Sequence, residues 1–519
     1  MAKKQLTVLV ILDGFGVAPA GESNAISRAR MPFYQSLLKQ YSHTTLQASG
    51  KYVGLPAGQS GNSEAGHMNI GAGRIVEQDA VVISKSINDG TFFRNPAFLG
   101  AVNHAKKYHS NVHLIGLLTG NQSAHADPDH LISLITLLKH HNIDNVFLHL
   151  FTDGRDSPRF FAQKLYQKHA GFFNKYAKIS TMMGRFYGMD RKKEWSRTAK
   201  AYNAMVFGTG LIETDPREAI FQAYARNESD EFIQPTVIVS NAKKPVGLIK
   251  DGDSVIFFNL RSDRARQMCK PFVQENFEQA NAGGFKRKKV LKNMFYVAMT
   301  DFGPDLGRMV TAYPSRDVID ALPVALKDYR QLAIAENEKY AHVTYFFNGG
   351  FADPIAGETR LIIASPNVRE YDQKPEMSLA LMTETVIKSI RARRYDFIVM
   401  NIANPDMIAH TGNLQATIKA CEYVDQALKK LVKVVLDQQG IVIVTGDHGN
   451  AEGLIDHNNG WPDTEHSTSP VPFIIVRQGA KLALKSGGVL GDIAPTILDL
   501  LHQPKPKVMT GKSLIKKHQ

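Results

Sequence analysis

The sequence has little cysteine and no long hydrophobic run, and both absences restrict where the protein can work. Only Cys269 and Cys421 occur among 519 residues, and neither lies in a C-x-x-C motif, which excludes a disulfide framework. We therefore expect a reducing compartment, the cytoplasm. No stretch approaches the roughly 18 consecutive apolar residues that a membrane helix requires. The apolar run Leu6–Leu12 is short and leads directly into Asp13, so it predicts a first β-strand instead of a secretion signal.

The chain also lacks a concentrated basic patch and a complete nucleotide-binding motif. Lys and Arg exceed Asp and Glu by 62 to 49, and the net charge of +13 favours anionic partners. Charge alone leaves nucleic acid, an anionic membrane and small phosphorylated metabolites open. The basic residues are dispersed, and the one dense run, Lys286–Lys289, is expected to be a solvated surface segment. A G-x-G-x-x-G motif fails at Val76 and a P-loop fails at Pro506, because each position would need glycine.

Length and composition predict a globular protein of two or three domains, because 519 residues exceed one ordinary core and 43% of them are hydrophobic. Segments with the pattern of buried strands alternate with helical patterns, which is typical of the α/β class. A separate α/β block begins near residue 79, and the first pattern resumes near residue 311. The chain therefore predicts a discontinuous domain of residues 1–78 and 311–519, interrupted by an inserted domain of residues 79–310.

The individual strands are predicted from short apolar or β-branched runs bounded by turn signals. In the discontinuous domain we expect strands at Thr7–Leu12, His342–Phe347, Phe397–Asn401, Ile441–Thr445 and Phe473–Val476. In the inserted domain we expect strands at Val112–Leu118, Val146–Phe151, Ile179–Met183, Val255–Leu260 and Met294–Thr300. A regular apolar face predicts a long amphipathic helix over Leu414–Asp437.

A short polar loop from Gly61 to Gly66 carries Ser63 near its centre. Its glycines allow backbone amides to approach a ligand closely, and Ser63 is presented where a helix could begin. A serine hydroxyl is a weak nucleophile at neutral pH, so a catalytic role requires a base or a metal contributed by other segments. An N-cap serine in an ordinary loop is the alternative, and the loop by itself does not decide between them.

Acidic and imidazole side chains follow several predicted strands, which predicts a metal site. The segment Asn404-Pro405 suits an N-cap and a first helical residue, and it puts Asp406 and His410 one helical turn apart on a common face. Carboxylate and imidazole ligands fit Mn, Mg, Zn or Fe and do not choose among them. The candidate ligands are Asp13, Asp406, His410, Asp447, His448 and His466.

Arginines follow three predicted strands of the inserted domain. Guanidinium groups bind phosphate and carboxylate through two parallel hydrogen bonds, so a set of them at neighbouring strand ends predicts an anion site. A single arginine in such a place is more often an ordinary surface residue. The candidate residues are Arg155, Arg185, Arg191, Arg261 and Arg264.

Taken together, these motifs resemble one family, the cofactor-independent phosphoglycerate mutases of the alkaline phosphatase superfamily. The resemblance extends over nearly the whole chain in the order of the family. It rests on Leu12 to Gly16, Gly61 to His67, Asp153 to Asp156, Arg185 to Arg191, Arg261 to Arg264, Asn404 to Gly412, Asp447 to Glu452, and His466-Ser467. It implies an alkaline-phosphatase-like α/β/α sandwich interrupted by an inserted α/β phosphotransferase domain.

The resemblance also implies a role for individual residues. Ser63 would be phosphorylated transiently, Asp156 would help to move protons at the glycerate hydroxyls, and Lys339 would neutralise phosphoryl charge. Two divalent cations are expected, Mn²⁺ first and Mg²⁺, Co²⁺ or Zn²⁺ as alternatives, without 2,3-bisphosphoglycerate. One cation would be held by Asp13, Ser63, Asp447 and His448, and the other by Asp406, His410 and His466. The substrate would be held by His125, Arg155, Asp156, Arg185, Arg191, Arg261, Arg264 and Lys339.

One loop departs from the family pattern. A Gly-Gly pair is usual shortly before the histidine that matches His125, whereas this chain has Thr119-Gly120-Asn121-Gln122-Ser123-Ala124. Spacing back from Arg155 still identifies His125, but the loop in front of it is expected to have a different shape.

The implied reaction is the interconversion of 3-phosphoglycerate and 2-phosphoglycerate in glycolysis and gluconeogenesis. We expect small phosphorylated metabolites as partners, no nucleic acid or membrane, a monomer, and hinge motion at the crossings near residues 78 and 311. Two other classes compete with this interpretation. A hydrolase of the same superfamily would release phosphate to water, and a basic nucleic-acid-binding protein would need a basic face and aromatic platforms.

Overall fold

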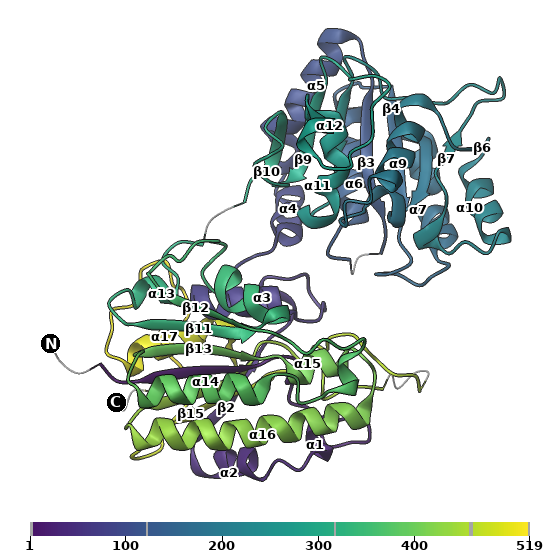
Figure 1. Ribbon diagram of the computed structural model, residues 1–519. Helices are drawn as coiled ribbons and strands as arrows, with labels where there is room; N and C mark the ends of the chain where they lie inside the picture. Colours follow the sequence, from purple (N-terminus) through teal and green to yellow (C-terminus); the bar gives the residue numbers. More distant parts are fainter. Residues whose placement is uncertain (1–3, 121–122, 316–317, 456–459, 517–519) are drawn as a thin grey trace. The chain divides into compact units, whose positions relative to one another are not determined.

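The chain folds into two compact units (Figure 1). The computed structural model describes residues 4–120, 123–315, 318–455 and 460–516. Unit 1 is Met1–Gln78 with Asp317–Gln519, and unit 2 is Asp79–Arg316. The first crossing has the expected position, whereas the second lies beyond the expected residue 310. Strand β10 (Met309–Tyr313) explains the difference, because it pairs in parallel with β9 (Phe295–Thr300) and extends the sheet of unit 2.

The sheet of unit 1 has the strand order β12-β11-β13-β1-β14-β15-β2-β16. Parallel pairing joins β12 to β11, β11 to β13, and β1 to both β13 and β14, whereas β15 is antiparallel to β14 and β2. The strands are β1 (Thr7–Leu12), β2 (Ser42–Gln47), β11 (Gln331–Glu336), β12 (Thr359–Ile363), β13 (Phe397–Ile402), β14 (Ile441–Gly446), β15 (Val471–Val476) and β16 (Gly488–Val489).

Helices cover both faces of this sheet and make an α/β/α sandwich (Figure 1). The longer helices are α2 (Pro32–Gln40), α3 (Ser63–Ala72), α14 (Leu379–Arg391), α16 (Leu414–Asp437) and α17 (Ile493–Leu500); the short ones are α1 (Ala25–Arg28), α13 (Leu322–Ala325) and α15 (Asn404–Ala409).

Strand β1 shows why both faces need a helical layer, because its side chains alternate between two apolar clusters. Val8, Val10 and Leu12 pack with residues of α2, α14 and α16, whereas Leu9 and Ile11 pack with residues of α3 and α17. All five side chains are fully buried. A strand that is apolar on both faces is typical of the interior of a parallel sheet.

Unit 2 has a second sheet of order β10-β9-β8-β3-β4-β5-β7-β6, parallel except where β7 meets β5. Its other strands are β3 (Val112–Leu118), β4 (Val146–Thr152), β5 (Lys178–Gly184), β6 (Leu211–Glu213), β7 (Thr236–Ile238) and β8 (Ser254–Phe257). Its helices are α4 (Asp79–Asn88), α5 (Pro96–Tyr108), α6 (Pro128–His140), α7 (Ala162–Tyr176), α8 (Arg185–Gly188), α9 (Trp195–Phe207), α10 (Pro216–Ala225), α11 (Ser262–Val273) and α12 (Phe277–Ala280).

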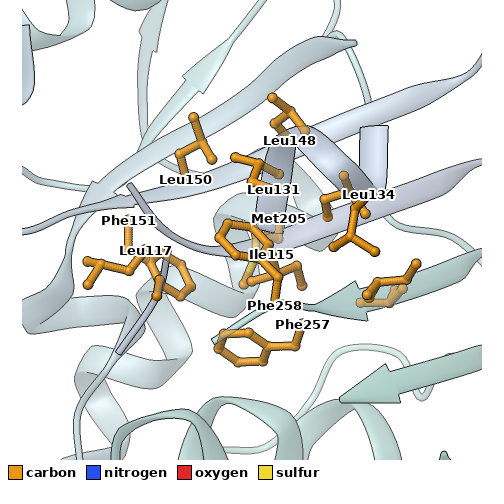
Figure 2. Packing of buried hydrophobic residues seen from close by; sticks show 14 of the residues in the cluster. Ile115, Leu117, Leu131, Leu134, Leu148, Leu150, Phe151, Met205, Phe257 and Phe258 are labelled. Atoms are coloured by element: carbon orange, nitrogen blue, oxygen red, sulfur yellow. The ribbon is translucent and has the colours of Figure 1, made fainter. Parts of the chain in front are cut away.

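The core of unit 2 forms between these helices and the central strands. Figure 2 shows Leu131 and Leu134 of α6 and Met205 of α9 among Ile115 of β3 and Leu148 of β4. These residues belong to one buried cluster that is separate from the clusters of unit 1. Each unit therefore has its own hydrophobic core, as an inserted domain requires.

Two expectations about local structure are wrong. His342–Phe346 is a short π-helical segment and not a strand, and the nearby strand is β11; a short apolar run does not distinguish a strand from a buried helical turn. Asn404 is the first residue of α15, and Ala403 precedes it as the cap residue.

The basic run Lys286–Lys289 is exposed as expected at its three lysines, with one exception. Arg287 is buried, and its guanidinium donates to the carbonyls of Pro271, Gln274 and Glu275.

Within the described residues, no helix is long and apolar enough to cross a membrane.

Candidate functional site

The candidate metal ligands of unit 1 lie where neighbouring parallel strands end. Asp13 directly follows β1, Asp447 directly follows β14, and Asp406 lies in α15 just after β13. Because β13, β1 and β14 are adjacent and parallel, their carboxyl ends meet at one edge of the sheet. That edge is where ligands bind in open α/β sheets. The fourth segment is the start of α3, where Ser63 is the first helical residue.

Ser63 is not the cap of its helix. The side chain of Asn62 fills that role by accepting a hydrogen bond from the amide of Ala65 at 2.8 Å. The Ser63 hydroxyl is therefore available to the site: its Oγ donates to Asp13 Oδ1 at 3.2 Å and lies 2.9 Å from His448 Nε2. The N-cap alternative is thus excluded for this serine, because Asn62 caps α3.

Two clusters of potential ligand atoms adjoin this hydroxyl. In the first, His448 Nε2 lies 3.4 Å from Asp13 Oδ1 and 3.6 Å from Asp447 Oδ2, and all three side chains are fully buried. In the second, Asp406 Oδ1 lies 3.4 Å from His410 Nε2 and 3.3 Å from His466 Nε2. The rings of His448 and His466 stack with centroids 4.0 Å apart, so the two clusters are neighbours.

The hydrogen bonds of the imidazoles show that this donor set fits cations. His410 Nδ1 lies 2.8 Å from the carbonyl of Thr464, and His466 Nδ1 lies 2.9 Å from the carbonyl of Gly61. A carbonyl only accepts, so both Nδ1 atoms carry a proton, and in the neutral form of each imidazole Nε2 is then the atom with a free lone pair. These two Nε2 atoms face each other at 3.0 Å. Acceptors that converge in this way, each fixed from behind by a carbonyl, are typical of metal-binding histidines.

Lys339 supplies a positive charge to the same site. Its Nζ donates to Asp13 Oδ1 at 2.6 Å, to Ser63 Oγ at 2.7 Å and to Asp406 Oδ2 at 2.7 Å. Burial opposes the ammonium charge, but the carboxylates of Asp13 and Asp406 raise the pKa of Lys339 above its ordinary value. Burial likewise opposes ionisation of Asp13, yet Lys339 holds the pKa of that carboxyl well below its usual range. The site therefore combines ionised carboxylates, a serine hydroxyl and a permanent cation.

Several candidate substrate residues of unit 2 lie around the carboxylates of Asp153 and Asp156. The buried guanidinium of Arg185 donates through Nη1 to Asp153 Oδ1 at 2.6 Å and lies 3.1 Å from Asp156 Oδ2. Ser123 Oγ donates to Asp156 Oδ2 at 2.6 Å and accepts from the amide of His125 at 3.1 Å. The loops after β3 and β4 are thus connected through Asp156.

Cationic side chains surround this network. Arg264 has a pKa below its ordinary value because of burial and because Arg185, Arg191 and Arg155 lie near it. Burial and the adjacent Arg185 also lower the pKa of His125 to about 3, so this imidazole is neutral at physiological pH. The neighbouring guanidinium groups disfavour the charge of Arg264, so an anion bound beside it would be stabilising.

The remaining arginines have carboxylate partners at the rim of this network. Arg191 pairs with Asp263 at 2.6 Å, Arg261 Nε lies 3.6 Å from the same carboxylate, and Arg155 lies 3.5 Å from Glu231. Arg155 and Arg191 are about half exposed, with 52% of each side chain accessible. They are accessible enough to exchange these partners for an anionic ligand.

Two residues of unit 2 were overlooked in the sequence. Asp153 accepts from the backbone amides of Arg155 and Asp156 at 3.2 and 3.1 Å, so it shapes the loop that carries both. Its place directly before Gly154-Arg155-Asp156 was a signal for this role. Ser123 gave no signal beyond the departure of its loop from the family pattern. Asn121 and Gln122 of that loop lie outside the described residues.

Comparison with known proteins identifies the class. The model of the metalloenzyme superfamily matches residues 5–505, so the chain belongs to that superfamily. It is 45% identical to the 2,3-bisphosphoglycerate-independent phosphoglycerate mutase of Moorella thermoacetica, with 98% of each chain covered, and 46% identical to that of Clostridium perfringens strain SM101, with 100% of each covered. A solved structure of Leishmania mexicana phosphoglycerate mutase superposes with a TM-score of 0.78 at 29% identity, covering 99% of this chain and 98% of that one.

The chain therefore belongs to the family of 2,3-bisphosphoglycerate-independent phosphoglycerate mutases. The family resemblance drawn from the motifs and the two-domain α/β fold class are confirmed.

Proposed function

We propose that the protein interconverts 3-phosphoglycerate and 2-phosphoglycerate through transient phosphorylation of Ser63, without 2,3-bisphosphoglycerate. The observation that carries this proposal is the surroundings of one hydroxyl. Ser63 Oγ lies at the start of a helix, 3.2 Å from Asp13 Oδ1, 2.9 Å from His448 Nε2 and 2.7 Å from Lys339 Nζ. The helix N-terminus and the ammonium group both favour a negatively charged phosphoryl group at this position.

The metal centre would bind two divalent cations through the residues described above. Asp13, Ser63, Asp447 and His448 would hold one, and Asp406, His410 and His466 the other. The oxygen and nitrogen donors suit several divalent metals, and the family resemblance puts Mn²⁺ first, with Mg²⁺, Co²⁺ or Zn²⁺ as alternatives. When bound, such cations lower the pKa of a coordinated hydroxyl and withdraw charge from phosphoryl oxygens.

Phosphoryl transfer then proceeds in two steps at Ser63. Ser63 Oγ loses its proton and bonds to phosphorus while the bond from phosphorus to the glycerate C3 oxygen breaks. That oxygen takes up a proton, and the dephosphorylated glycerate stays bound in the site. The C2 hydroxyl next loses its proton and attacks phosphoserine, which releases Ser63 Oγ and gives 2-phosphoglycerate. Lys339 neutralises charge on the transferring group through its ammonium donors.

Unit 2 would serve as the phosphotransferase and substrate-binding domain. Arg155, Arg191, Arg261 and Arg264, together with Arg185, would hold the glycerate carboxylate and phosphate oxygens through charge-assisted hydrogen bonds. Asp156 would exchange protons with the glycerate hydroxyls, and neutral His125 would contact them as a hydrogen-bonding group. A mutase must retain glycerate for the second transfer, whereas a phosphatase can release its dephosphorylated product. The arginine cluster, which could hold glycerate, therefore favours a mutase.

An assay of product identity tests the proposal. Purified protein, stripped of metal and then supplied with Mn²⁺, Mg²⁺, Co²⁺ or Zn²⁺ in separate reactions, is incubated with 3-phosphoglycerate in the absence of 2,3-bisphosphoglycerate. We expect 2-phosphoglycerate as the main product. Inorganic phosphate as the main product would replace the mutase with a hydrolase, and no turnover with any of the four metals would refute both.

Replacement of the nucleophile gives a sharper test. Ser63→Ala should reduce kcat by at least about 10⁴-fold, because no other hydroxyl takes up the phosphoryl group. Ser60→Ala in the same loop is the matched control and should retain activity. Incubation of the wild type with substrate, rapid acid quenching and peptide mass spectrometry should find the phosphate on Ser63; retained turnover in Ser63→Ala would assign the nucleophile elsewhere.

The proposal includes a glycolytic and gluconeogenic role for a cytoplasmic monomer with small phosphorylated metabolites as ligands.

A further inference from the structure

A buried carboxylate next to the metal centre has no part in the reaction described above. Glu452 is only 3% exposed, and its two oxygens accept three hydrogen bonds. Its Oε2 accepts from the backbone amides of Gly16 and Asn450, both at 2.9 Å, and its Oε1 accepts from the hydroxyl of Ser467. Charge-assisted bonds of this kind are stronger than those between neutral groups.

The three donors belong to three different segments, and each follows a metal-ligand candidate closely in the sequence. Gly16 lies three residues after Asp13, Asn450 lies two residues after His448, and Ser467 directly follows His466. One carboxylate therefore joins the segment after β1, the segment after β14 and the loop of His466.

Asn450 extends the connection to the fourth segment. Its side-chain Nδ2 donates to Asp406 Oδ1 at 2.8 Å, while its backbone amide donates to Glu452. Further backbone hydrogen bonds join the same segments: the amide of Ala451 donates to the carbonyl of Gly14 at 2.9 Å, and the amide of Ser467 donates to the carbonyl of Gly449 at 3.0 Å. The ligand segments thus form one hydrogen-bonded assembly with Glu452 at its centre.

Two glycines, Gly16 and Gly449, allow the backbone to lie close to the carboxyl group of Glu452. A Cβ atom on Gly16 or on Gly449 would overlap the carboxyl group of Glu452, and one on Gly449 would also overlap Ser467 Oγ. Neither glycine has a positive φ, so close packing against Glu452, and not backbone strain, explains the absence of a side chain there.

We propose that Glu452 is a positioning residue, which acts through Gly16, Asn450 and Ser467 to hold the metal-ligand segments in the arrangement that binds cations. It does not need to be a ligand, because its oxygens are already occupied by protein donors. Residues that orient metal ligands from behind typically change metal affinity about 10- to 100-fold when they are removed. This inference rests on the proposed metal centre.

Metal titration of the full-length protein tests the role of Glu452 without reference to activity. Mn²⁺ is titrated calorimetrically into metal-free wild type, Glu452→Ala and Glu452→Gln. We expect Glu452→Ala to weaken Mn²⁺ binding about 10- to 100-fold, because three donors lose their acceptor. Glutamine keeps one oxygen for the two amides and should weaken binding clearly less than alanine does. Equal affinity of folded Glu452→Ala and wild type would overturn the inference.

A milder variant guards against a general loss of folding. Ser467→Ala removes the hydrogen bond from the loop of His466 to Glu452 and the one that the same hydroxyl accepts from the amide of Ser469 at 3.1 Å. Both bonds belong to the loop of His466, so the variant should weaken binding of the cation held by Asp406, His410 and His466 and leave the other unchanged. Circular dichroism of each metal-free variant verifies that it is folded. Unchanged binding of both cations in Ser467→Ala would overturn the connection to that loop.

The wild-type titration separates the two levels of the argument. If the wild type binds no Mn²⁺, the proposed metal centre fails and the inference fails with it. If the wild type binds two cations and Glu452→Ala binds them equally well, only the positioning role of Glu452 fails.

Discussion

At the scale of single residues, the most informative contact is the hydrogen bond from Ser123 to Asp156. Burial alone would raise the pKa of Asp156, but Arg185, the hydroxyl of Ser123 and the nearby His125 together hold it below its ordinary value. The carboxyl is therefore ionised at physiological pH and ready to accept a proton. Ser123 occupies the loop that departs from the family pattern.

Removal of the Ser123 hydroxyl should shift the pH dependence of the reaction. A hydrogen bond to the ionised carboxylate lowers its pKa, so Ser123→Ala should raise the pKa of Asp156. Activity that needs ionised Asp156 would then be lost at a higher pH on the acid side, and the acid limb of kcat/KM should move upward. Profiles of kcat/KM against pH for both proteins measure the shift.

Ser123→Thr is the control for this prediction. It keeps a hydroxyl at the same position and should restore the wild-type acid limb. A profile for Ser123→Ala that coincides with the wild type would show that Ser123 does not control this titration. Mn²⁺ affinity should be unchanged in both variants, because the candidate metal ligands lie in unit 1.

At the scale of elements, helix α3 depends on a close approach that only glycine permits. Gly71 lies on α3 against the backbone carbonyl of Phe347, which follows the helical segment His342–Phe346. A Cβ atom at this position would overlap that carbonyl. The helix that begins with Ser63 is thus packed directly against the segment that the sequence had suggested as a strand.

Gly71→Ala should destabilise unit 1 by about 1–3 kcal/mol, the usual cost of forcing extra volume into a packed interior. Gly171→Ala in the exposed part of α7 is the matched control, because within the described residues an added Cβ there meets no atom within 4 Å. That substitution should stabilise its helix by about 0.5–1 kcal/mol, since alanine suits a helix interior better than glycine. Urea denaturation measures both changes; equal stability of Gly71→Ala and wild type would contradict the packing argument.

At the scale of the whole molecule, two separate cores predict two separate responses to metal. The candidate metal ligands come from both chain segments of unit 1, before and after the insertion. A ligand that binds only the folded state stabilises it by mass action, about 2.7 kcal/mol at 100 times its Kd. Metal binding should therefore raise the stability of unit 1, to which both segments contribute ligands, and leave the stability of unit 2 unchanged.

Hydrogen exchange with and without a chelator should reveal this difference. In the presence of Mn²⁺, we expect slower exchange in the segments after β1, β13 and β14 and at the start of α3. Peptides from the sheet of unit 2 should exchange at the same rate in both conditions and serve as the internal control. An equal change in both units would contradict a metal centre that is confined to unit 1.

Much of the fold followed from local patterns. Thr7–Leu12 and Leu414–Asp437 have the predicted bounds, because a strand buried on both faces and a long amphipathic helix each leave a strong periodic signal. Weak signals failed: edge strand β10 is only partly buried, which led to a domain boundary that is too early, and the short apolar run at His342–Phe346 matched two structures equally well.

The sequence by itself determined which residues could form the site, since parallel strands deliver Asp13 and Asp447 to one edge of a sheet. Only the tertiary structure decided how they act. The ammonium of Lys339 reaches Ser63 across 276 positions of sequence, Glu452 joins loops that are remote in the chain, and Arg287 is buried within a basic run. Hydrogen bonds and burial depend on the distances between segments that are remote in the sequence. Those distances are set only when the cores pack, so a local sequence pattern does not contain them.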